Sequence, residues 1–203
     1  LGINATLAMY IAALIIIGYT FLGGFSAVCW TDFFQGLLML AALLVAPIVA
    51  LFIMDTTGSA SSAADLPEGY WTFFTGWKDI VSGMGWGLGY FGMPHIIIRF
   101  MSIKSQHELR KASRIGIVWT FLILLFSVAA GCIGHLFLGG DIDGSVVFIT
   151  MVRRIFSGPW LGILSGLLLS AILAAAMSTA DSQLLAASSS FASDVYKPVF
   201  RKG

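Results

Sequence analysis

The sequence predicts an all-α membrane protein that crosses the bilayer several times, and three observations support this. Hydrophobic residues fill 58% of the 203 positions and charged residues only 10%, whereas a soluble domain carries about 25% charged residues. The apolar residues form long continuous runs, without the alternation of a half-buried strand or the stripe of an amphipathic helix. Residues 33–54, 115–138 and 159–180 hold no Asp, Glu, Lys or Arg, and each run is long enough to cross a hydrocarbon core of about 30 Å as a helix.

Five membrane segments are expected in chain order. They cover about residues 3–22, 33–54, 79–101, 115–138 and 159–185, and the last continues as a helix to about Ser193. Pro47 predicts a kink in the second segment, which neighbouring helices can accommodate. Because the chain starts with Leu1 and already inside an apolar stretch, we expect residues 1–203 to be a single fragment of a larger membrane domain, whose missing helices are its partners.

The third segment is expected to be broken rather than straight. Glycine recurs within it and proline follows, at Gly83, Gly85, Gly87, Gly89, Gly92 and Pro94. Glycine and proline both weaken a continuous helix. In lipid, a broken helix is tolerated only where protein or a water-filled cavity covers the freed backbone. The segment should therefore lie inside the protein.

The basic residues predict the orientation of these segments. The connection between the third and fourth segments carries five basic residues against one acid, Glu108: Arg99 at its start, then Lys104, Arg110, Lys111 and Arg114 within residues 102–114. An excess of Lys and Arg in a short loop marks the cytoplasmic side, so residues 55–78 and 139–158 are expected outside. Arg153 and Arg154 depart from this pattern, and a short surface helix in the second outside loop would accommodate them.

Small residues recur at every fourth position of the fifth segment. They are Gly158, Gly162, Gly166, Ser170, Ala174, Ser178, Ser182, Ala186 and Ser190. Four residues advance about 400° around a helix, so these positions form one slowly winding face that lets another backbone approach closely. Helix packing explains the outer half of this face. The inner half adds hydroxyls and an acid, which packing alone does not require.

That inner half is a candidate cation site. Ser178, Asp181 and Ser182 share a helix face at spacings of three and four, and Thr179 lies about 100° away from Ser178. Hydroxyl, carboxylate and carbonyl oxygens suit a small hard cation such as sodium. Asp32 is expected to open the second segment at its cytoplasmic end, at a depth in the membrane similar to that of Asp181. An acid within the membrane indicates function by default, but simple hydration, or an N-cap role for Asp32, stays open.

The broken segment is a candidate substrate site. Trp86, Tyr90 and Pro94 are spaced four residues apart, so their side chains can form one wall of a pocket. Backbone amides freed at the break are expected to hold a carboxylate. The alternative interpretation is an aromatic packing stripe.

Three stretches together resemble the sodium:solute symporter family, and most closely its proline-transporting branch. Residues 85–101 resemble the family's broken helix, residues 177–185 its sodium-site helix, and residues 30–32 the motif that opens its fifth core helix. The resemblance covers essentially the whole chain in the right order. It implies a partial LeuT-type core, in which two five-helix repeats are inverted relative to one another. This chain would supply the last two helices of the first repeat and the first three of the second.

The resemblance also implies roles for individual residues. One sodium site would use the backbone carbonyl of Ala175 with the hydroxyls of Ser178 and Thr179. A second, present in some members, would use Asp32, Ser178, Asp181 and Ser182. Trp86, Tyr90 and Pro94 match positions that select substrate. Met93 departs from the pattern, because known proline transporters of the family carry glutamine there, and methionine lacks the hydrogen-bonding amide.

The expected function is therefore sodium-coupled symport of a small amino acid, with L-proline as the cargo, in the bacterial plasma membrane. The chain is expected to be a secondary active transporter and not an enzyme, with sodium as its coupling ion and the bilayer as its surroundings. A net charge of +1 without a long basic tract argues against nucleic acid as a partner. Two alternatives stay open: another solute, such as pantothenate, another carboxylate or a sugar, and the symporter-like membrane domain of a sensor kinase.

Overall fold

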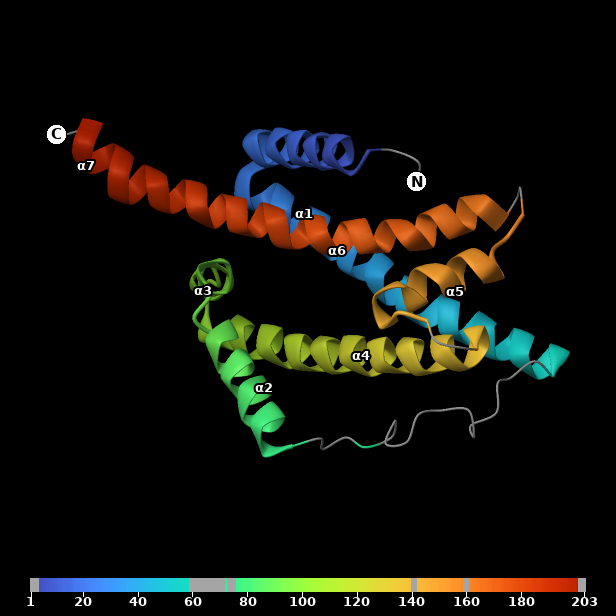
Figure 1. The fold of residues 1–203 in the computed structure, drawn as a ribbon. Helices are drawn as coiled ribbons and strands as arrows, with labels where there is room; N and C mark the ends of the chain where they lie inside the picture. The colour runs from blue at the N-terminus through green and yellow to red at the C-terminus, as the bar shows by residue number, and fades with distance from the viewer. Residues whose placement is uncertain (1–3, 59–71, 73–75, 140–141, 159–160, 201–203) are drawn as a thin grey trace.

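The computed structural model describes residues 4–58, 72, 76–139, 142–158 and 161–200, and every regular element in these ranges is helical. In chain order they are α1 (Ala5–Thr57), α2 (Trp77–Tyr90), α3 (Pro94–Met101), α4 (Gln106–Leu138), a 3-10 turn (Gly144–Val146), α5 (Val147–Ile155), α6 (Leu161–Ser190), a π-helical turn (Phe191–Tyr196) and α7 (Lys197–Phe200), as Figure 1 shows. The predicted all-α class is confirmed. Helices α1, α4 and α6 with its continuation are each long and apolar enough to cross a membrane.

Helix α1 consists of two arms that meet at Gly24. Gly24 has φ 54° and ψ −147°, a backbone conformation that is essentially restricted to glycine. Figure 1 shows the arm before Gly24 turning away from the arm after it. The second arm thus starts well before residue 33 and runs through Pro47. Asp32 lies inside this arm, so the expectation that it opens or caps a helix is wrong.

The core forms where the second arm of α1, α5 and α6 meet. Ala42, Ala46 and Ala50 lie on one face of α1 and are almost completely buried. Their small side chains let α5 approach closely, and Met151 and Val152 of α5 are fully buried against them. The most extensive helix–helix interface joins α1 to α6, and the next joins α1 to α4. These contacts fix α1 and α6 relative to one another, which is what positions the polar cluster described below.

Arg153 and Arg154 lie on α5, on the short helix that their charges predict, and both are exposed. The guanidinium of Arg154 donates to the backbone carbonyl of Leu138 at 3.3 Å and lies over the ring of Phe137, 5.6 Å from its centroid. The arginines project from α5 while its opposite face is buried. The other expected outside loop, residues 55–78, lies largely outside the described residues.

The broken third segment is confirmed, and the break falls between α2 and α3. The backbone amides there are already used: Phe91 donates to Leu88 at 3.3 Å, Gly92 to Gly89 at 3.1 Å, and Met93 to Tyr90 at 3.3 Å. The expectation that amides freed at the break hold a carboxylate is therefore wrong for these three. None of the residues of α2 or α3 is buried, although α3 packs against α6, so the described helices do not enclose the broken segment.

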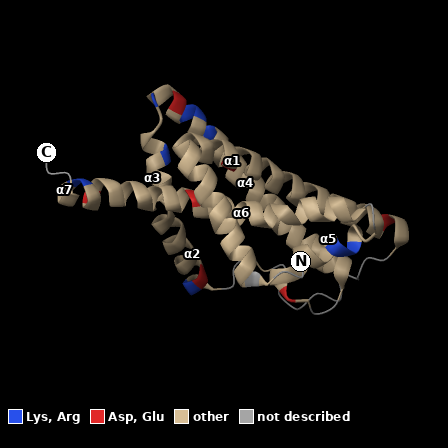
Figure 2. Ribbon diagram, turned by 90° about the horizontal axis from the view of Figure 1, so that it is seen from above, with Lys and Arg blue, Asp and Glu red and all other residues tan. Residues whose placement is uncertain are grey.

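Helix α4 begins at Gln106, so most of the expected cytoplasmic loop 102–114 is helical. The Ser105 hydroxyl accepts from the Glu108 amide at 3.3 Å, which is the N-cap arrangement that a Ser-x-x-Glu sequence favours. The basic residues of this stretch remain together at one end of the bundle, and Arg153 and Arg154 lie toward the other end (Figure 2).

The small-residue face of α6 is only half buried. Its inner part, including Ala174, Ser182 and Ala186, is buried, but Gly162 and Gly166 in its outer part are exposed. The outer half of α6 packs instead through Ser165, Leu168 and Ala171. Packing among the described helices therefore leaves the outer half of this face uncovered, and helix packing as its explanation stays a prediction.

Candidate cation site

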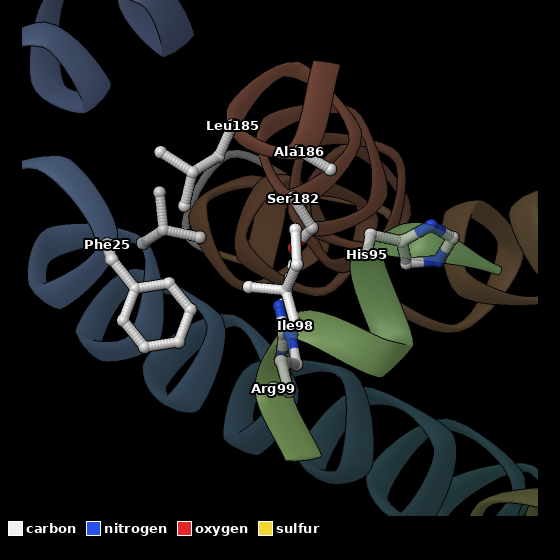
Figure 3. Close-up of a pocket in the computed structure, with 8 residues that line it drawn as sticks. Phe25, His95, Ile98, Arg99, Ser182, Leu185 and Ala186 are labelled. Atoms are coloured by element: carbon white, nitrogen blue, oxygen red, sulfur yellow. Dashed lines mark hydrogen bonds between the residues drawn. The ribbon is translucent and has the colours of Figure 1, made fainter. Parts of the chain in front are cut away.

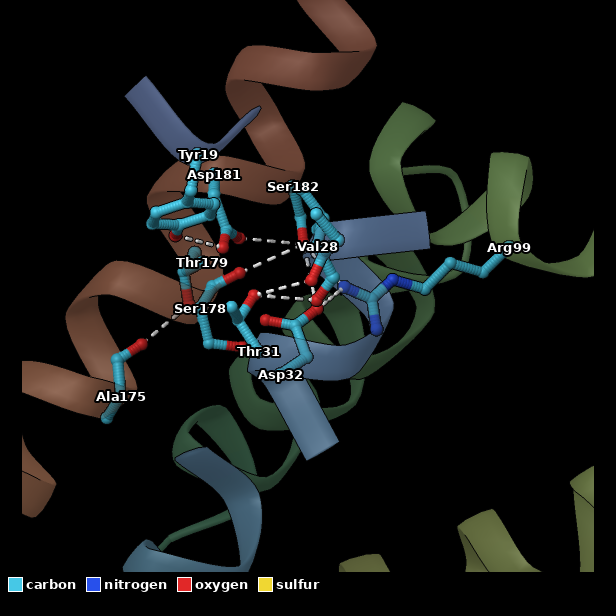
Figure 4. Close-up of polar contacts among 11 residues, drawn as sticks. Tyr19, Val28, Thr31, Asp32, Arg99, Ala175, Ser178, Thr179, Asp181 and Ser182 are labelled. Atoms are coloured by element: carbon cyan, nitrogen blue, oxygen red, sulfur yellow. Dashed lines mark hydrogen bonds and ion pairs between the residues drawn. The ribbon is translucent and has the colours of Figure 1, made fainter. Parts of the chain in front are cut away.

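A polar cluster forms where both arms of α1 meet α3 and α6, and Figure 4 shows its side chains. The first arm contributes Tyr19, the second Asp32, α3 contributes Arg99, and α6 contributes Asp181 and Ser182. Asp181 is 0% exposed and Ser182 6% exposed. Because burying a carboxylate is expensive unless it is paired or hydrogen-bonded, so dense a cluster in an apolar protein indicates a functional site.

The hydroxyl of Ser182 lies at the centre of the cluster. It donates to the backbone carbonyl of Ser178 at 2.9 Å. The same oxygen lies 3.3 Å from Asp181 Oδ1 and 3.4 Å from Asp32 Oδ2. Asp32 thus converges in space with Asp181 and with Ser182, which lies 150 residues further along the chain, and Ser178 adds its carbonyl. These four residues are the ones that the resemblance assigns to the second sodium site.

Tyr19 was not expected at this site. Its phenol donates to Asp181 Oδ2 at 2.6 Å, a charge-assisted hydrogen bond across 162 residues of sequence. The Gly24 turn makes this contact possible, because it brings the first arm of α1 over α6 (Figure 1). A single tyrosine in an apolar run carries no local signal of such a role.

Arg99 was also missed, since the charge pattern assigns it to the basic cytoplasmic boundary. Its guanidinium forms an ion pair with Asp32 Oδ2 and a hydrogen bond to Ser182 Oγ. The Asp32 side chain is 8% exposed and that of Arg99 42% exposed. A basic residue six positions beyond the break of a glycine-rich helix could have been recognised as reaching back into the protein, because long arginine side chains cover such distances.

One oxygen of the Asp32 carboxylate has no partner. In the part of the chain that the structure describes, three buried side-chain oxygens lack a hydrogen bond: Thr20 Oγ1, Asp32 Oδ1 and Gln35 Oε1. A buried unsatisfied carboxylate oxygen is uncommon, and an ion or a water molecule is its ordinary partner. Among the described residues, no three His, Cys, Asp or Glu side chains gather, so the ligand atoms present are the hydroxyl, carboxylate and carbonyl oxygens that suit sodium.

The residues assigned to the first sodium site lie on the flank of α6. The hydroxyl of Thr179 donates to the carbonyl of Ala175 at 3.2 Å, and the Thr179 side chain is exposed. Ser178 is half-buried between this pair and the Asp181–Ser182 cluster. The described residues therefore present one side of a possible oxygen cage, which a further helix would have to close.

The four expected substrate residues separate into two pairs. Met93 and Pro94 line an open cavity of about 390 Å³, together with His95 and with Gln183, Ala186, Ala187 and Ser190 of α6. Trp86 and Tyr90 lie on α2, are 73% and 48% exposed, and are not part of the lining of that cavity. The structure thus brings the residues at the break to α6 and leaves the aromatic pair on an uncovered helix.

A second, much smaller cavity lies between α1, α3 and α6 (Figure 3). It measures about 10 Å³, and Arg99 and Ser182 form its polar side, while Phe25, Val28 and Ile98 contribute apolar lining. That volume is at the lower limit for one water molecule. The cavity therefore leaves little room on the side of Ser182 that faces Arg99.

Comparison with known proteins identifies the family and the relatives of this chain. The model of the sodium:solute symporter family matches residues 1–203. The sodium/proline symporter 2 of Staphylococcus saprophyticus is 45% identical over 202 residues, covering 97% of this chain and 39% of that protein. A sodium/proline symporter of Staphylococcus aureus strain USA300 shows the same identity and coverage. No solved structure matches the chain.

The chain thus spans about two fifths of the length of these curated relatives. Its apolar helices, its broken helix and its buried carboxylates are found together in a sequence that the family model matches from end to end. This chain belongs to the sodium:solute symporter family and is an integral membrane protein.

Proposed function

We propose that the full-length protein containing this chain is a symporter of the bacterial plasma membrane that uses the sodium gradient to import L-proline. The observation that carries the proposal is the convergence of Asp32, Asp181 and Ser182 into one buried oxygen cluster, in a chain 45% identical to proteins named sodium/proline symporters. A buried carboxylate pair with a central hydroxyl binds a hard cation readily, and a co-transported ion has to enter and leave such a site.

Sodium bound at the first position would connect α6 to a helix beyond this chain. The Ala175 carbonyl and the Thr179 hydroxyl lie on the exposed flank of α6, and the family resemblance places the first core helix opposite them. An ion shared between two helices stabilises the arrangement in which both contribute ligands. If that arrangement also completes the substrate site, sodium and proline raise each other's affinity by the same factor.

Substituting Ser178 or Thr179 by alanine tests this first position. Each substitution removes one hydroxyl ligand, and the expected result is a rise of about tenfold or more in the sodium concentration for half-maximal uptake, since a lost polar contact of about 1.4 kcal/mol is worth a factor of ten. Sodium titration of proline uptake measures it. Ser170→Ala is the matched control, because among the described residues that hydroxyl donates to the Leu167 carbonyl, at 2.7 Å, farther out on α6. Unchanged sodium dependence in both variants would refute the assignment.

Tyr19→Phe tests whether the phenol orients Asp181. The substitution keeps the ring and removes the hydrogen bond to a fully buried carboxylate, a loss of about 1–3 kcal/mol. We expect the half-saturating sodium concentration to rise at least fivefold, with the maximal rate less affected. Tyr10→Phe, on the exposed side of the same arm, is the control. Equal sodium dependence of the two variants would show that Tyr19 does not act on the site.

The cargo is tested most simply by binding. Purified full-length protein should bind labelled proline in sodium and much less in potassium, and excess unlabelled proline should displace the label. Met93 favours a second candidate, a related solute, because it lines the cavity at the break and lacks an amide. If pantothenate or a sugar displaced the label at lower concentrations than proline does, that solute and not proline would be the cargo.

A further inference from the structure

Arg99 occupies the position at which the second sodium ion would be coordinated. Its guanidinium contacts Asp32 Oδ2 and Ser182 Oγ, two of the oxygens that the family resemblance assigns to that ion. We propose that Arg99 is a tethered cation that exchanges with sodium at the second site and thereby couples the ion to the broken helix. This inference rests on the proposed function, since it requires sodium to be the ion that enters.

The charges at the site favour exchange over joint occupancy. The Asp32 side chain is 8% exposed, so its carboxylate requires a nearby positive charge or several hydrogen bonds. Arg99 now supplies that charge at Oδ2, while Oδ1 has no partner. The second carboxylate, Asp181, is already held by Tyr19 and lies next to Ser182. A sodium ion placed between Asp32 and Ser182 would therefore meet a guanidinium on the same oxygens.

The space around the guanidinium on the Ser182 side is small as well. The cavity beside the guanidinium measures about 10 Å³, at the lower limit for a single water molecule. The Arg99 side chain is 42% exposed and has a long flexible stem, so its head can withdraw from Asp32 without unfolding α3. Withdrawal vacates the contacts on Asp32 and Ser182, which sodium then takes over.

Exchange at this site acts directly on α3, the helix that follows the break. Arg99 belongs to α3, whose first residue, Pro94, lines the open cavity together with Met93. With arginine bound, the ion pair ties α3 to the second arm of α1 and to α6. When sodium replaces it, α3 loses this tie and can adjust at the Met93–Pro94 break. By reciprocity, a solute that draws α3 away from Asp32 raises the sodium affinity of the site.

The proposal and a purely structural role for Arg99 predict opposite changes in sodium affinity. If Arg99 merely orients Asp32 for sodium, removing the guanidinium weakens sodium binding. If Arg99 competes with sodium, removing it strengthens sodium binding. Arg99→Gln keeps a side chain of similar polarity without the charge, and Arg99→Lys keeps the charge without the planar fork.

The test measures sodium binding to the purified full-length protein through the sodium-dependent rise in its thermal unfolding midpoint, a readout independent of transport. We expect Arg99→Gln to lower the half-saturating sodium concentration at least fivefold and Arg99→Lys to stay within twofold of the parent. Arg110→Gln, which removes an exposed arginine of α4, should change nothing. The Arg99→Gln effect should vanish when Asp32→Asn is added, which assigns it to the second site. Weaker or unchanged sodium binding in Arg99→Gln would overturn the proposal.

A second measurement tests the exchange between Arg99 and sodium even if Arg99→Gln does not fold. Ile98 lies half-buried beside Arg99 in the small cavity, so Ile98→Cys reports release of α3 once Cys29 and Cys132 are replaced by serine. We expect sodium to accelerate alkylation of this cysteine at least threefold over potassium. An alkylation rate that is the same in both salts overturns the proposal. Absence of sodium-dependent proline binding, with sodium still accelerating alkylation, would instead contradict the proposed cargo and leave the exchange intact.

Discussion

Replacing Asp32 by asparagine is expected to raise the sodium concentration for half-maximal proline uptake at least tenfold, or to abolish uptake altogether. The carboxylate is nearly buried and is shared between Arg99 and Ser182. Removing one partner of a buried ion pair costs about 3–5 kcal/mol, because the other charge is left uncompensated. Asparagine also removes the negative charge that would hold sodium once Arg99 has withdrawn. Both effects reduce the occupancy of the second site.

Sodium titration of uptake in the full-length protein, corrected for the amount of transporter in the membrane, measures this effect. Asp55→Asn is the matched control, because Asp55 is an exposed acid near the far end of the same helix. A wild-type sodium dependence in Asp32→Asn would show that the buried carboxylate takes no part in ion binding. It would also remove the basis for an exchange with Arg99.

Gly24→Val is expected to have the largest effect on folding. The backbone at Gly24, with φ 54° and ψ −147°, excludes β-branched residues, and holding a side chain there costs about 1–3 kcal/mol or more. A Cβ at Gly24 would meet no atom within 4 Å, so the loss would come from the backbone and not from a clash. The turn would open, and Tyr19 would separate from Asp181.

We therefore expect Gly24→Val to lower the thermal unfolding midpoint and the yield of folded protein, and to weaken sodium binding in what remains. Gly18→Ala is the control, since Gly18 lies within the helix of the same arm and a Cβ there also meets nothing within 4 Å. Alanine at such a position is neutral or slightly stabilising. If valine at position 24 left the unfolding midpoint unchanged, the two-armed shape of α1 would not depend on this glycine.

Most of the helices could be predicted from the sequence, because a long uncharged apolar run has few alternatives in a membrane. The turn in α1 falls at Gly24, inside the connection expected between the first two segments, but the sequence suggested a linker of several residues where the backbone bends at one glycine. The start of α4 was recognisable in principle from the Ser-x-x-Glu sequence at Ser105. The basic residues of 102–114 were assigned to a loop from their charge alone, without regard to the helix cap at Ser105.

The candidate site was predicted in part. Asp181 and Ser182 follow from helical spacing, and Asp32 from its place in the resemblance. Tyr19 and Arg99 contact the site from 162 and 83 residues away in sequence, and helical periodicity carries no information about such contacts. Similarly, the glycine-rich break was visible in the sequence, but the short turns that occupy its amides were not.

The surfaces left open indicate where the rest of the protein belongs. None of the residues of α2 is buried, and Gly162 and Gly166 on the small-residue face of α6 are exposed. The relatives are more than twice as long as this chain. We infer that helices beyond residues 1–203 cover Trp86, Tyr90 and the Thr179 flank of α6, completing the substrate site and the first sodium site.

The most direct test of sodium-coupled proline transport is uptake of labelled proline by proteoliposomes that contain the full-length protein, with and without an inward sodium gradient. The proposed function predicts transient accumulation of proline above its outside concentration when sodium is high outside. Accumulation should disappear with equal sodium on both sides or with potassium in its place. Equal uptake under all three conditions, or no uptake in any, would contradict sodium-coupled proline symport.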